Sequence, residues 1–211
     1  MGSSFMSQIP TVLDLLQQIH AKSMFDVGKG FGKYGLLVHE YFGIPTAVRP
    51  DPGRMLREQS MVAIDAVESN PFYMWPHLDH IYRKIYVGRV GQLLKQFPHY
   101  DLVLMCDVLE HLNKADGVTV VHWFLSRDSI LFVTIPKDWF KQAALHENPD
   151  EEHKSYWASE DFKQFGSWFT WQNLGPGRAF ILSRQPLRLR AFGRQPINGA
   201  KRIAHAILNE L

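Results

Sequence analysis

Short apolar runs alternate with segments of helical periodicity along most of the chain. A run of apolar residues bounded by turn residues predicts a buried strand, and apolar residues that recur at every third or fourth position predict a helix. Val12, Leu15, Leu16 and Ile19 follow the helical spacing. The predicted strands are 23–27, 61–67, 85–88, 101–106, 129–135, 168–173 and 178–183, and the predicted helices are 10–22, 33–41, 90–97, 108–125, 159–165 and 196–211.

This order of elements predicts an α/β fold. Five alternations of strand and helix favour a mostly parallel sheet with helices on both faces, seven-stranded once the last two strands are added. Those two strands flank 174–177 (Leu-Gly-Pro-Gly), whose turn residues predict an antiparallel C-terminal hairpin. We interpret 8–211 as a single domain and 1–7 as an N-terminal tail outside it, because 211 residues suit one domain.

Three glycines at alternate positions follow the first predicted strand. They are Gly28, Gly30 and Gly32, and the strand itself carries Asp26. Glycine allows a positive φ and lets a ligand approach bare main chain. The helix that follows begins with free N–H groups, which suit a polar or anionic ligand. The pattern predicts a site for a nucleotide-like cofactor.

The same glycines also fit a dinucleotide fingerprint in a shifted register. The segment 30–35 matches G-x-G-x-x-G, which would indicate an NAD(P)-dependent oxidoreductase. That fingerprint needs an acid about 20 residues further on, after the second strand. The segment 50–57 is instead a predicted loop, and the next acid that ends a strand, Glu68, lies 36 residues after Gly32. The missing acid disfavours the oxidoreductase.

Four segments, in order, resemble the class I S-adenosylmethionine-dependent methyltransferases of the small, single-domain type. The family's D-x-G-x-G-x-G opening is matched by 26–32, its second strand by 64–68, its fourth strand and following turn by 100–112, and its fifth strand by 130–136. The resemblance covers most of the chain. It implies a Rossmann-like fold, S-adenosylmethionine as the cofactor, and transfer of a methyl group to an oxygen or nitrogen atom.

The resemblance also assigns cofactor-binding residues. Glu68 ends the second strand where the family places a carboxylate that accepts both ribose hydroxyls. Asp26 would order the glycine loop or reach the cofactor's ammonium through water. Asp65 is a second acid, ranked lower because strand alternation places it within the strand rather than at its end. The predicted cofactor site is Asp26, Gly28, Gly30, Gly32, Glu68 and Asp107.

Two residues depart from the family pattern. Many relatives end the third strand with Gly-Asp, whose carboxylate binds the adenine amino group, whereas this chain has Gly88-Arg89. Arginine cannot accept a hydrogen bond, so the adenine-binding residues are left open. Lys29 stands where relatives often have a small residue and would narrow the pocket. These departures favour an alternative, a non-catalytic S-adenosylmethionine-binding partner subunit.

Acids and histidines gather near the predicted acceptor side. On a helix, Asp107, Glu110 and His111 would share one face, and His153 lies in the loop after the fifth strand. Three interpretations stay open. The residues are structural, or His111 or His153 is the general base that deprotonates the acceptor. In the third, Glu110, His111 and His153 bind a divalent metal that holds and acidifies a ribose diol, an arrangement that resembles the small-RNA terminal 2′-O-methyltransferases.

Composition and charge narrow the class of protein. With 45% hydrophobic residues and no long apolar run, we expect no membrane span, and a single cysteine, Cys106, fits a cytoplasmic protein without an internal disulfide. The net charge is +2, but no acid occurs between Phe162 and Asn209, so this segment either meets phosphate or an acidic partner or is a solvated face. We expect a small-molecule methyl acceptor and regard nucleic acid as less favoured. The oligomeric state is left open.

Overall fold

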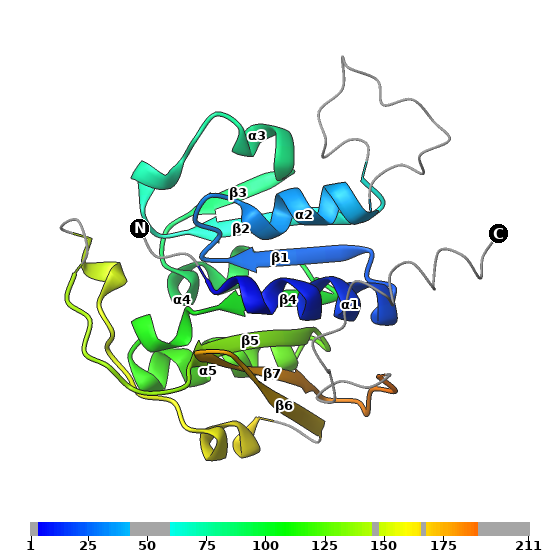
Figure 1. The fold of residues 1–211 in the computed structure, drawn as a ribbon. Coiled ribbons are helices and arrows are strands. Elements are labelled where there is room, and N and C mark those ends of the chain that lie inside the picture. Colours follow the sequence, from blue (N-terminus) through cyan, green and yellow to red (C-terminus); the bar gives the residue numbers. More distant parts are fainter. Residues whose placement is uncertain (1–3, 43–59, 145–147, 166–167, 190–211) are drawn as a thin grey trace.

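Seven strands form one mixed sheet in the order β3-β2-β1-β4-β5-β7-β6 (Figure 1). The computed structural model describes residues 4–42, 60–144, 148–165 and 168–189. The strands are β1 (Ser23–Val27), β2 (Ala63–Glu68), β3 (Lys84–Val87), β4 (Leu102–Cys106), β5 (Ile130–Pro136), β6 (Trp168–Leu174) and β7 (Gly177–Ser183).

The pairing of the strands confirms the predicted topology. The strands β1 to β5 pair in parallel, so that Met24 lies opposite Ile64 of β2 and Leu102 of β4. In contrast, β7 pairs antiparallel with both β5 and β6. The chain order reverses between β1 and β4, and open sheets of this kind bind ligands beyond the carboxyl ends of the strands at such a point.

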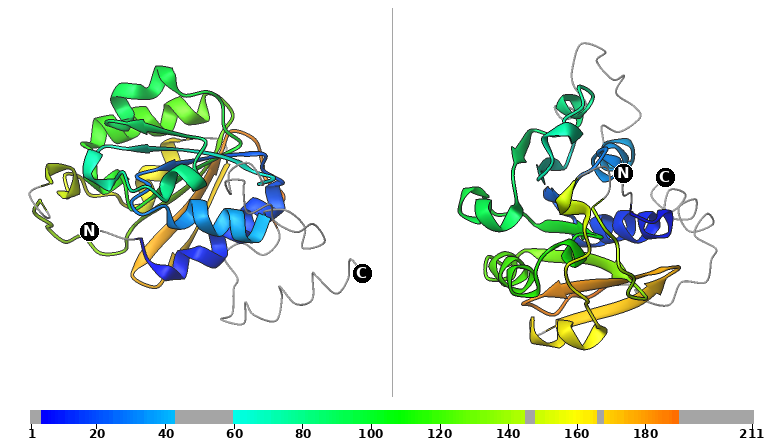
Figure 2. Two further views of the ribbon diagram at one scale, coloured as in Figure 1. Left: turned by 90° about the horizontal axis from the view of Figure 1, so that it is seen from above. Right: turned by 90° about the vertical axis from the view of Figure 1, so that its left-hand side faces the viewer.

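Helices cover both faces of the sheet (Figure 2). On one face lie α1 and α2, and on the other lie α4 and α5 (Figure 1). The α-helices are α1 (Ile9–Ile19), α2 (Lys33–Phe42), α3 (Leu78–Ile81), α4 (Val90–Leu93) and α5 (Lys114–Leu125), and the 3-10 turns are η1 (Met6–Gln8), η3 (Pro71–Tyr73), η4 (Leu94–Gln96), η5 (Leu109–His111), η6 (Pro149–Glu151) and η7 (Ser159–Gln164). No helix in these described ranges is long and apolar enough to cross a membrane.

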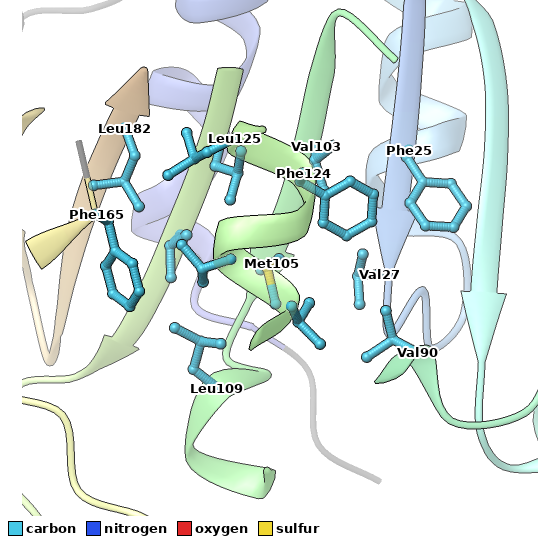
Figure 3. Packing of buried hydrophobic residues seen from close by; sticks show 14 of the residues in the cluster. Phe25, Val27, Val90, Val103, Met105, Leu109, Phe124, Leu125, Phe165 and Leu182 are labelled. Atoms are coloured by element: carbon cyan, nitrogen blue, oxygen red, sulfur yellow. The ribbon is translucent and has the colours of Figure 1, made fainter. Parts of the chain in front are cut away.

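The central strands are apolar on both sides because both sides are covered. Phe25 and Val27 of β1 pack toward α5, where they meet Phe124 (Figure 3). Met24 of the same strand packs on the opposite side with Leu15 of α1. Consecutive residues of a strand point to opposite faces, so a single apolar run contributes side chains to the hydrophobic layers on both faces of the sheet. The carboxyl end of β1 is therefore held rigidly between these two layers.

The helix predicted over 108–125 is divided in two. The structure has the 3-10 turn η5 first, and α5 starts at Lys114. Asp107 takes a left-handed backbone with φ 57°, and Asn113 is extended with ψ 147°, so neither can continue an α-helix. The polar residues after β4 are therefore presented on a tight turn instead of a helix face. The predicted helix 196–211 lies outside the described residues.

Candidate functional site

A cavity of about 510 Å³ opens beyond the carboxyl ends of β1, β2 and β4. Its walls come from the glycine loop after β1, from η5, and from the segment that follows β5, which runs along this edge of the sheet (Figure 1). The volume lies in the range of small-molecule and cofactor sites. All the predicted site residues line the cavity except Gly32.

The glycine loop has the backbone that the sequence predicts. Gly28, Gly30 and Gly32 have φ values of 70°, 51° and 81°, in the left-handed region. A Cβ at Gly32 would lie 2.7 Å from the side chain of Leu78, so this glycine permits close packing of α3. A Cβ at Gly30 would meet no atom within 4 Å. The loop therefore leaves open space against the cavity at Gly30, which fits a cofactor laid on the main chain.

Glu68 stands at the end of β2 with only 6% of its surface exposed. Its carboxylate accepts hydrogen bonds from the main-chain N–H of Gly30 (3.2 Å) and of Asn70 (3.0 Å). Burial raises the pKa of this carboxyl group. A carboxylate offers about four lone-pair directions, so Glu68 can still accept two hydroxyl donors. Asp65 is used differently, since it is bound by Arg83 at 2.8 Å, away from the cavity.

Asp26 is the second buried acid at this end of the cavity. It accepts a hydrogen bond of 2.6 Å from the hydroxyl of Tyr82, a residue that the sequence analysis missed. Burial raises the pKa of Asp26 to about 6, although the Tyr82 bond and the nearby Lys29 act in the opposite direction. The carboxyl group therefore ionises close to neutral pH, and the carboxylate can then interact with the ammonium group of a cofactor.

Lys29 points into the protein. Its Nζ atom donates to the carbonyl oxygen of Tyr73 at 2.8 Å, so the side chain connects the glycine loop to the segment after β2. Burial lowers the pKa of Lys29, whereas Glu68 and Asp26 act to raise it. Lys29 lines this wall of the cavity, and its positive charge compensates part of the negative charge of Glu68 and Asp26.

Asp107 is held by two distant segments. Its carboxylate accepts hydrogen bonds from Thr134 Oγ1 of β5 (2.9 Å) and from Gln8 Nε2 of η1 (3.2 Å). Its main-chain N–H also donates to Thr134 Oγ1 at 3.0 Å. Burial raises the pKa of Asp107. This residue lines the cavity, and its hydrogen bonds to Thr134 and Gln8 fix the turn after β4.

Glu110, His111 and His153 lie together at the other end of the cavity. One potential ligand atom from each falls within 4.8 Å of the others. Glu110 is 2% exposed, and burial raises the pKa of its carboxyl group well above the usual range. Burial lowers the pKa of His111, which favours its neutral form. The two imidazole rings lie 5.0 Å apart, so the structure brings together the predicted acid–histidine cluster.

A capping segment, defined as Asn148–Lys154, closes one side of the cavity. Asp150 pairs with Arg89 at 3.0 Å, and Glu151 accepts a 2.9 Å hydrogen bond from the hydroxyl of Tyr73. Arg89 therefore does not stand in for the adenine-binding acid of relatives but binds the capping segment. Sequence reasoning missed both contacts, because no local pattern indicates which residues a loop will meet.

An N-terminal strap, defined as Ser4–Gln8, closes another side. Ser4 and Phe5 line the cavity, and Lys33 Nζ donates to the carbonyl oxygen of Ser4 at 2.5 Å. Gln8 is fully buried between Asp107 and the hydroxyl of Tyr34. Ser4 and Phe5, which the sequence places in the predicted N-terminal tail, thus belong to the wall of the site.

Solved structures show where this architecture has been seen before. The chain aligns with the methyltransferase domain of bacterial CtHen1 at a TM-score of 0.56 and 16% identity, covering 84% of this chain and 97% of that one. It aligns with the plantazolicin methyltransferase BamL, solved with a triazolic desmethylPZN analog and SAH, at a TM-score of 0.55 and 10% identity, covering 85% and 86%.

A SAM-dependent methyltransferase from Archaeoglobus fulgidus matches at a TM-score of 0.47 and 15% identity. That alignment covers 72% of this chain, which spans 64% of the length of the archaeal protein. No family model and no curated protein sequence matches the chain. At these identities, the likeness shows a shared fold.

Proposed function

We propose that this chain, whose fold is that of the class I methyltransferases, transfers a methyl group from S-adenosylmethionine to an oxygen or nitrogen atom of a small-molecule acceptor. The observation that supports the proposal most is the composition of one cavity. Glu68, Asp26 and the open backbone at Gly30 line it at the carboxyl ends of the neighbouring strands β1 and β2, and His111 and His153 line it from the segments that follow β4 and β5. Methyl transfer requires the donor and the acceptor to bind next to each other in one cavity.

The first end suits the cofactor. Glu68 has acceptor capacity left for two ribose hydroxyls, and Asp26 supplies negative charge for an ammonium group. When bound, S-adenosylmethionine supplies the electrophilic methyl group: an acceptor lone pair forms the new bond to carbon while the electron pair of the broken carbon–sulfur bond stays on sulfur. The chain's main contributions are alignment of the two reactants and exclusion of water.

The second end suits removal of a proton. The Nδ1 atom of His111 lies 3.1 Å from the carbonyl oxygen of Glu152, and that of His153 lies 2.9 Å from the carbonyl oxygen of Phe140. A carbonyl oxygen can only accept, so each Nδ1 carries the proton and each Nε2 keeps a free lone pair. Either Nε2 atom could take the proton of an acceptor hydroxyl or ammonium group as a general base.

Binding and turnover test this proposal separately. Calorimetry should show binding of S-adenosylmethionine and S-adenosylhomocysteine and no binding of NAD. Incubation with methyl-labelled cofactor and fractionated cell extract should then yield a product that carries one labelled methyl group. Binding of NAD alone would overturn the proposal in favour of an oxidoreductase, and cofactor binding without transfer to any fraction would support a non-catalytic partner subunit.

The cluster of Glu110, His111 and His153 favours a second candidate function, metal-assisted methylation of an RNA ribose at its 2′-oxygen. The support is the approach of three potential ligand atoms to within 4.8 Å. In this version the ribose diol would bind a divalent ion, which would acidify the reacting hydroxyl. Labelled methyl transfer to short RNA, with none to DNA of the same sequence, would support this function. Absence of transfer to both RNA and DNA would favour the small-molecule acceptor instead.

A further inference from the structure

Three half-exposed aromatic side chains lie together beside the cavity. We call them the aromatic rim, defined as Trp139, Phe140 and Tyr156, which are 44%, 49% and 49% exposed. Phe140 also lines the cavity itself. Phenylalanine and tryptophan are mostly buried in folded proteins, and exposed apolar side chains that gather next to a cavity mark a binding surface. The methyl transfer proposed above does not by itself explain why these rings are exposed.

The rings of the aromatic rim form a continuous series with the imidazole of His153. The ring centroids of Tyr156 and Trp139 lie 6.1 Å apart, and those of Trp139 and His153 lie 5.7 Å apart. The centroid of His153 in turn lies 4.6 Å from that of Phe140. Because His153 is only 8% exposed and lines the cavity, the series connects the surface to the wall of the site. A ligand on the rim therefore contacts a candidate general base.

Main-chain hydrogen bonds hold the aromatic rim in place. The N–H group of His153 donates to the carbonyl oxygen of Gln142 at 3.1 Å, and its Nδ1 atom lies 2.9 Å from the carbonyl oxygen of Phe140. The Nζ atom of Lys114 donates to the carbonyl oxygen of Tyr156 at 2.7 Å. The backbone that carries the rings is thus fixed before a ligand arrives, which lowers the entropic cost of binding.

The shape and size of the aromatic rim suit a flat ring better than a protein partner. Aromatic rings attract one another in offset-stacked and edge-to-face arrangements. The planes of Trp139 and Tyr156 are 74° apart, so a flat ligand can stack on one ring and meet the edge of the other. Three half-exposed aromatic side chains offer about 200–400 Å². Each partner in a stable protein interface contributes about 800 Å².

The polar groups next to His153 favour an uncharged ligand. Burial raises the pKa of Glu110 well above its usual range, which favours the protonated carboxyl group. Burial lowers the pKa of His111, which favours the neutral imidazole. Both residues lie beside His153 in the wall of the cavity. This corner therefore offers little charge to attract an ionic group.

From these contacts we propose that the aromatic rim binds the methyl acceptor, and that the acceptor is a flat aromatic compound that carries its reacting hydroxyl group on the ring. The inference rests on the proposed methyl transfer. The ring lies against Phe140 and Trp139, and its hydroxyl group faces the Nε2 atom of His153, the imidazole in contact with the rim.

The chemistry of proton removal favours a hydroxyl group on an aromatic ring. Such a group has a pKa of about 10, as in tyrosine, whereas water, which an aliphatic hydroxyl resembles more, has a pKa of about 15.7. An imidazole therefore deprotonates the aromatic hydroxyl far more readily. The proton passes to Nε2, an oxygen lone pair forms the bond to the methyl carbon, and the electron pair of the broken carbon–sulfur bond stays on sulfur.

Binding to the aromatic rim can be measured without turnover. Calorimetry compares 2-naphthol with 2-decalol, the saturated alcohol of the same carbon skeleton, with and without S-adenosylhomocysteine. We expect 2-naphthol to bind more tightly than 2-decalol. Trp139→Leu and Phe140→Leu should each weaken 2-naphthol binding by about twofold to tenfold, the effect of losing one aromatic contact. Trp171→Leu is the matched control, because Trp171 is also 44% exposed but lies on β6, outside the cavity wall.

Three results would overturn the assignment of the aromatic rim. They are no binding of 2-naphthol to the wild type, equal affinity for the two compounds, and an equal loss of affinity in the Trp171 variant. A wild-type dimer that dissociates in the rim variants, measured by sedimentation, would show that the rim is instead an interface between two copies. Failure of the proposed function looks different, since 2-naphthol would still bind and S-adenosylhomocysteine would not. Thermal melts check that all three variants fold.

The hydroxyl group has its own test. With methyl-labelled S-adenosylmethionine, 2-naphthol should be methylated faster than 2-naphthylamine, which offers a nitrogen atom on the same ring system. Equal or faster transfer to the amine, or no transfer to either compound, would overturn the assignment of an aromatic hydroxyl as the acceptor.

Discussion

At the scale of single residues, Asp26 is a buried acid that lowers the stability of the fold. Burial raises its pKa to about 6 in the folded protein, above the ordinary value of 3.8. A carboxyl group with a raised folded pKa contributes its full stability below the unfolded pKa and loses it as pH rises through about 6. A shift of about two pKa units corresponds to about 3 kcal/mol at neutral pH and above.

We therefore expect Asp26→Asn to be more stable than wild type at pH 8 and to lose this advantage toward pH 4. The asparagine keeps an oxygen for the hydroxyl of Tyr82 but carries no charge to desolvate. Urea denaturation at several pH values measures the difference in the free energy of unfolding. The same variant should bind S-adenosylhomocysteine more weakly. A stability difference that does not change with pH would contradict this account.

Glu68 and Asp65 form a matched pair of acids on one strand. Glu68→Gln should weaken S-adenosylhomocysteine binding by about tenfold to a hundredfold, since hydrogen bonds to a charged group contribute about 1.5–3 kcal/mol. Asp65→Asn should leave affinity unchanged but lower stability, because Arg83 and Tyr100 both donate to this carboxylate at 2.8 Å. Calorimetry and thermal melts on both variants measure the two effects, and a reversed pattern would exchange the roles of the two acids.

At the scale of elements, the capping segment forms one wall of the cavity and is held there in part by Arg89. The side chain of Arg89 is 56% exposed, so its pair with Asp150 adds little to global stability. Arg89→Gln should leave the melting temperature nearly unchanged and should speed release of S-adenosylhomocysteine, because one of the contacts that hold the segment down is lost.

The double variant Arg89→Gln, Asp150→Asn provides the control. Both single changes remove the same contact, so the double variant should release the ligand no faster than the faster single variant. Stopped-flow release measures the three rates. Additive effects on the release rate would show that Arg89 and Asp150 do not act through the salt bridge between them.

At the scale of the whole molecule, cofactor binding should stabilise the fold. A ligand at about 100 times its Kd adds about 2.7 kcal/mol, and each kcal/mol shifts the Tm of a domain of about this size by about 2–4 °C. We expect S-adenosylhomocysteine to raise the Tm by about 5–10 °C and NAD to leave it unchanged. Differential scanning fluorimetry measures this, and the opposite ranking would indicate the dinucleotide interpretation of the glycines.

The local pattern was sufficient for the fold and for many of the residues that line the cavity. The strand β1 starts and ends where the apolar run predicts, and the antiparallel hairpin follows from the turn at 174–177. The pattern failed where backbone and distant contacts decide together. The left-handed Asp107 interrupts the predicted helix, and its partner Gln8 comes from the start of the domain. Periodicity carries no information on such long-range partners.

One feature of the whole molecule has a thermodynamic consequence. Through Asp150 and Glu151, the capping segment contacts the part of the cavity proposed for the cofactor, and through His153, it contacts the part proposed for the methyl acceptor. A ligand that orders this segment at one end reduces the loss of conformational entropy that accompanies binding of the second ligand at the other end. Linkage requires the effect to be reciprocal, so the acceptor must tighten the binding of S-adenosylhomocysteine by the same factor by which S-adenosylhomocysteine tightens the binding of the acceptor. Either ligand can thus prepare the protein for the other, and the final complex does not depend on which arrives first.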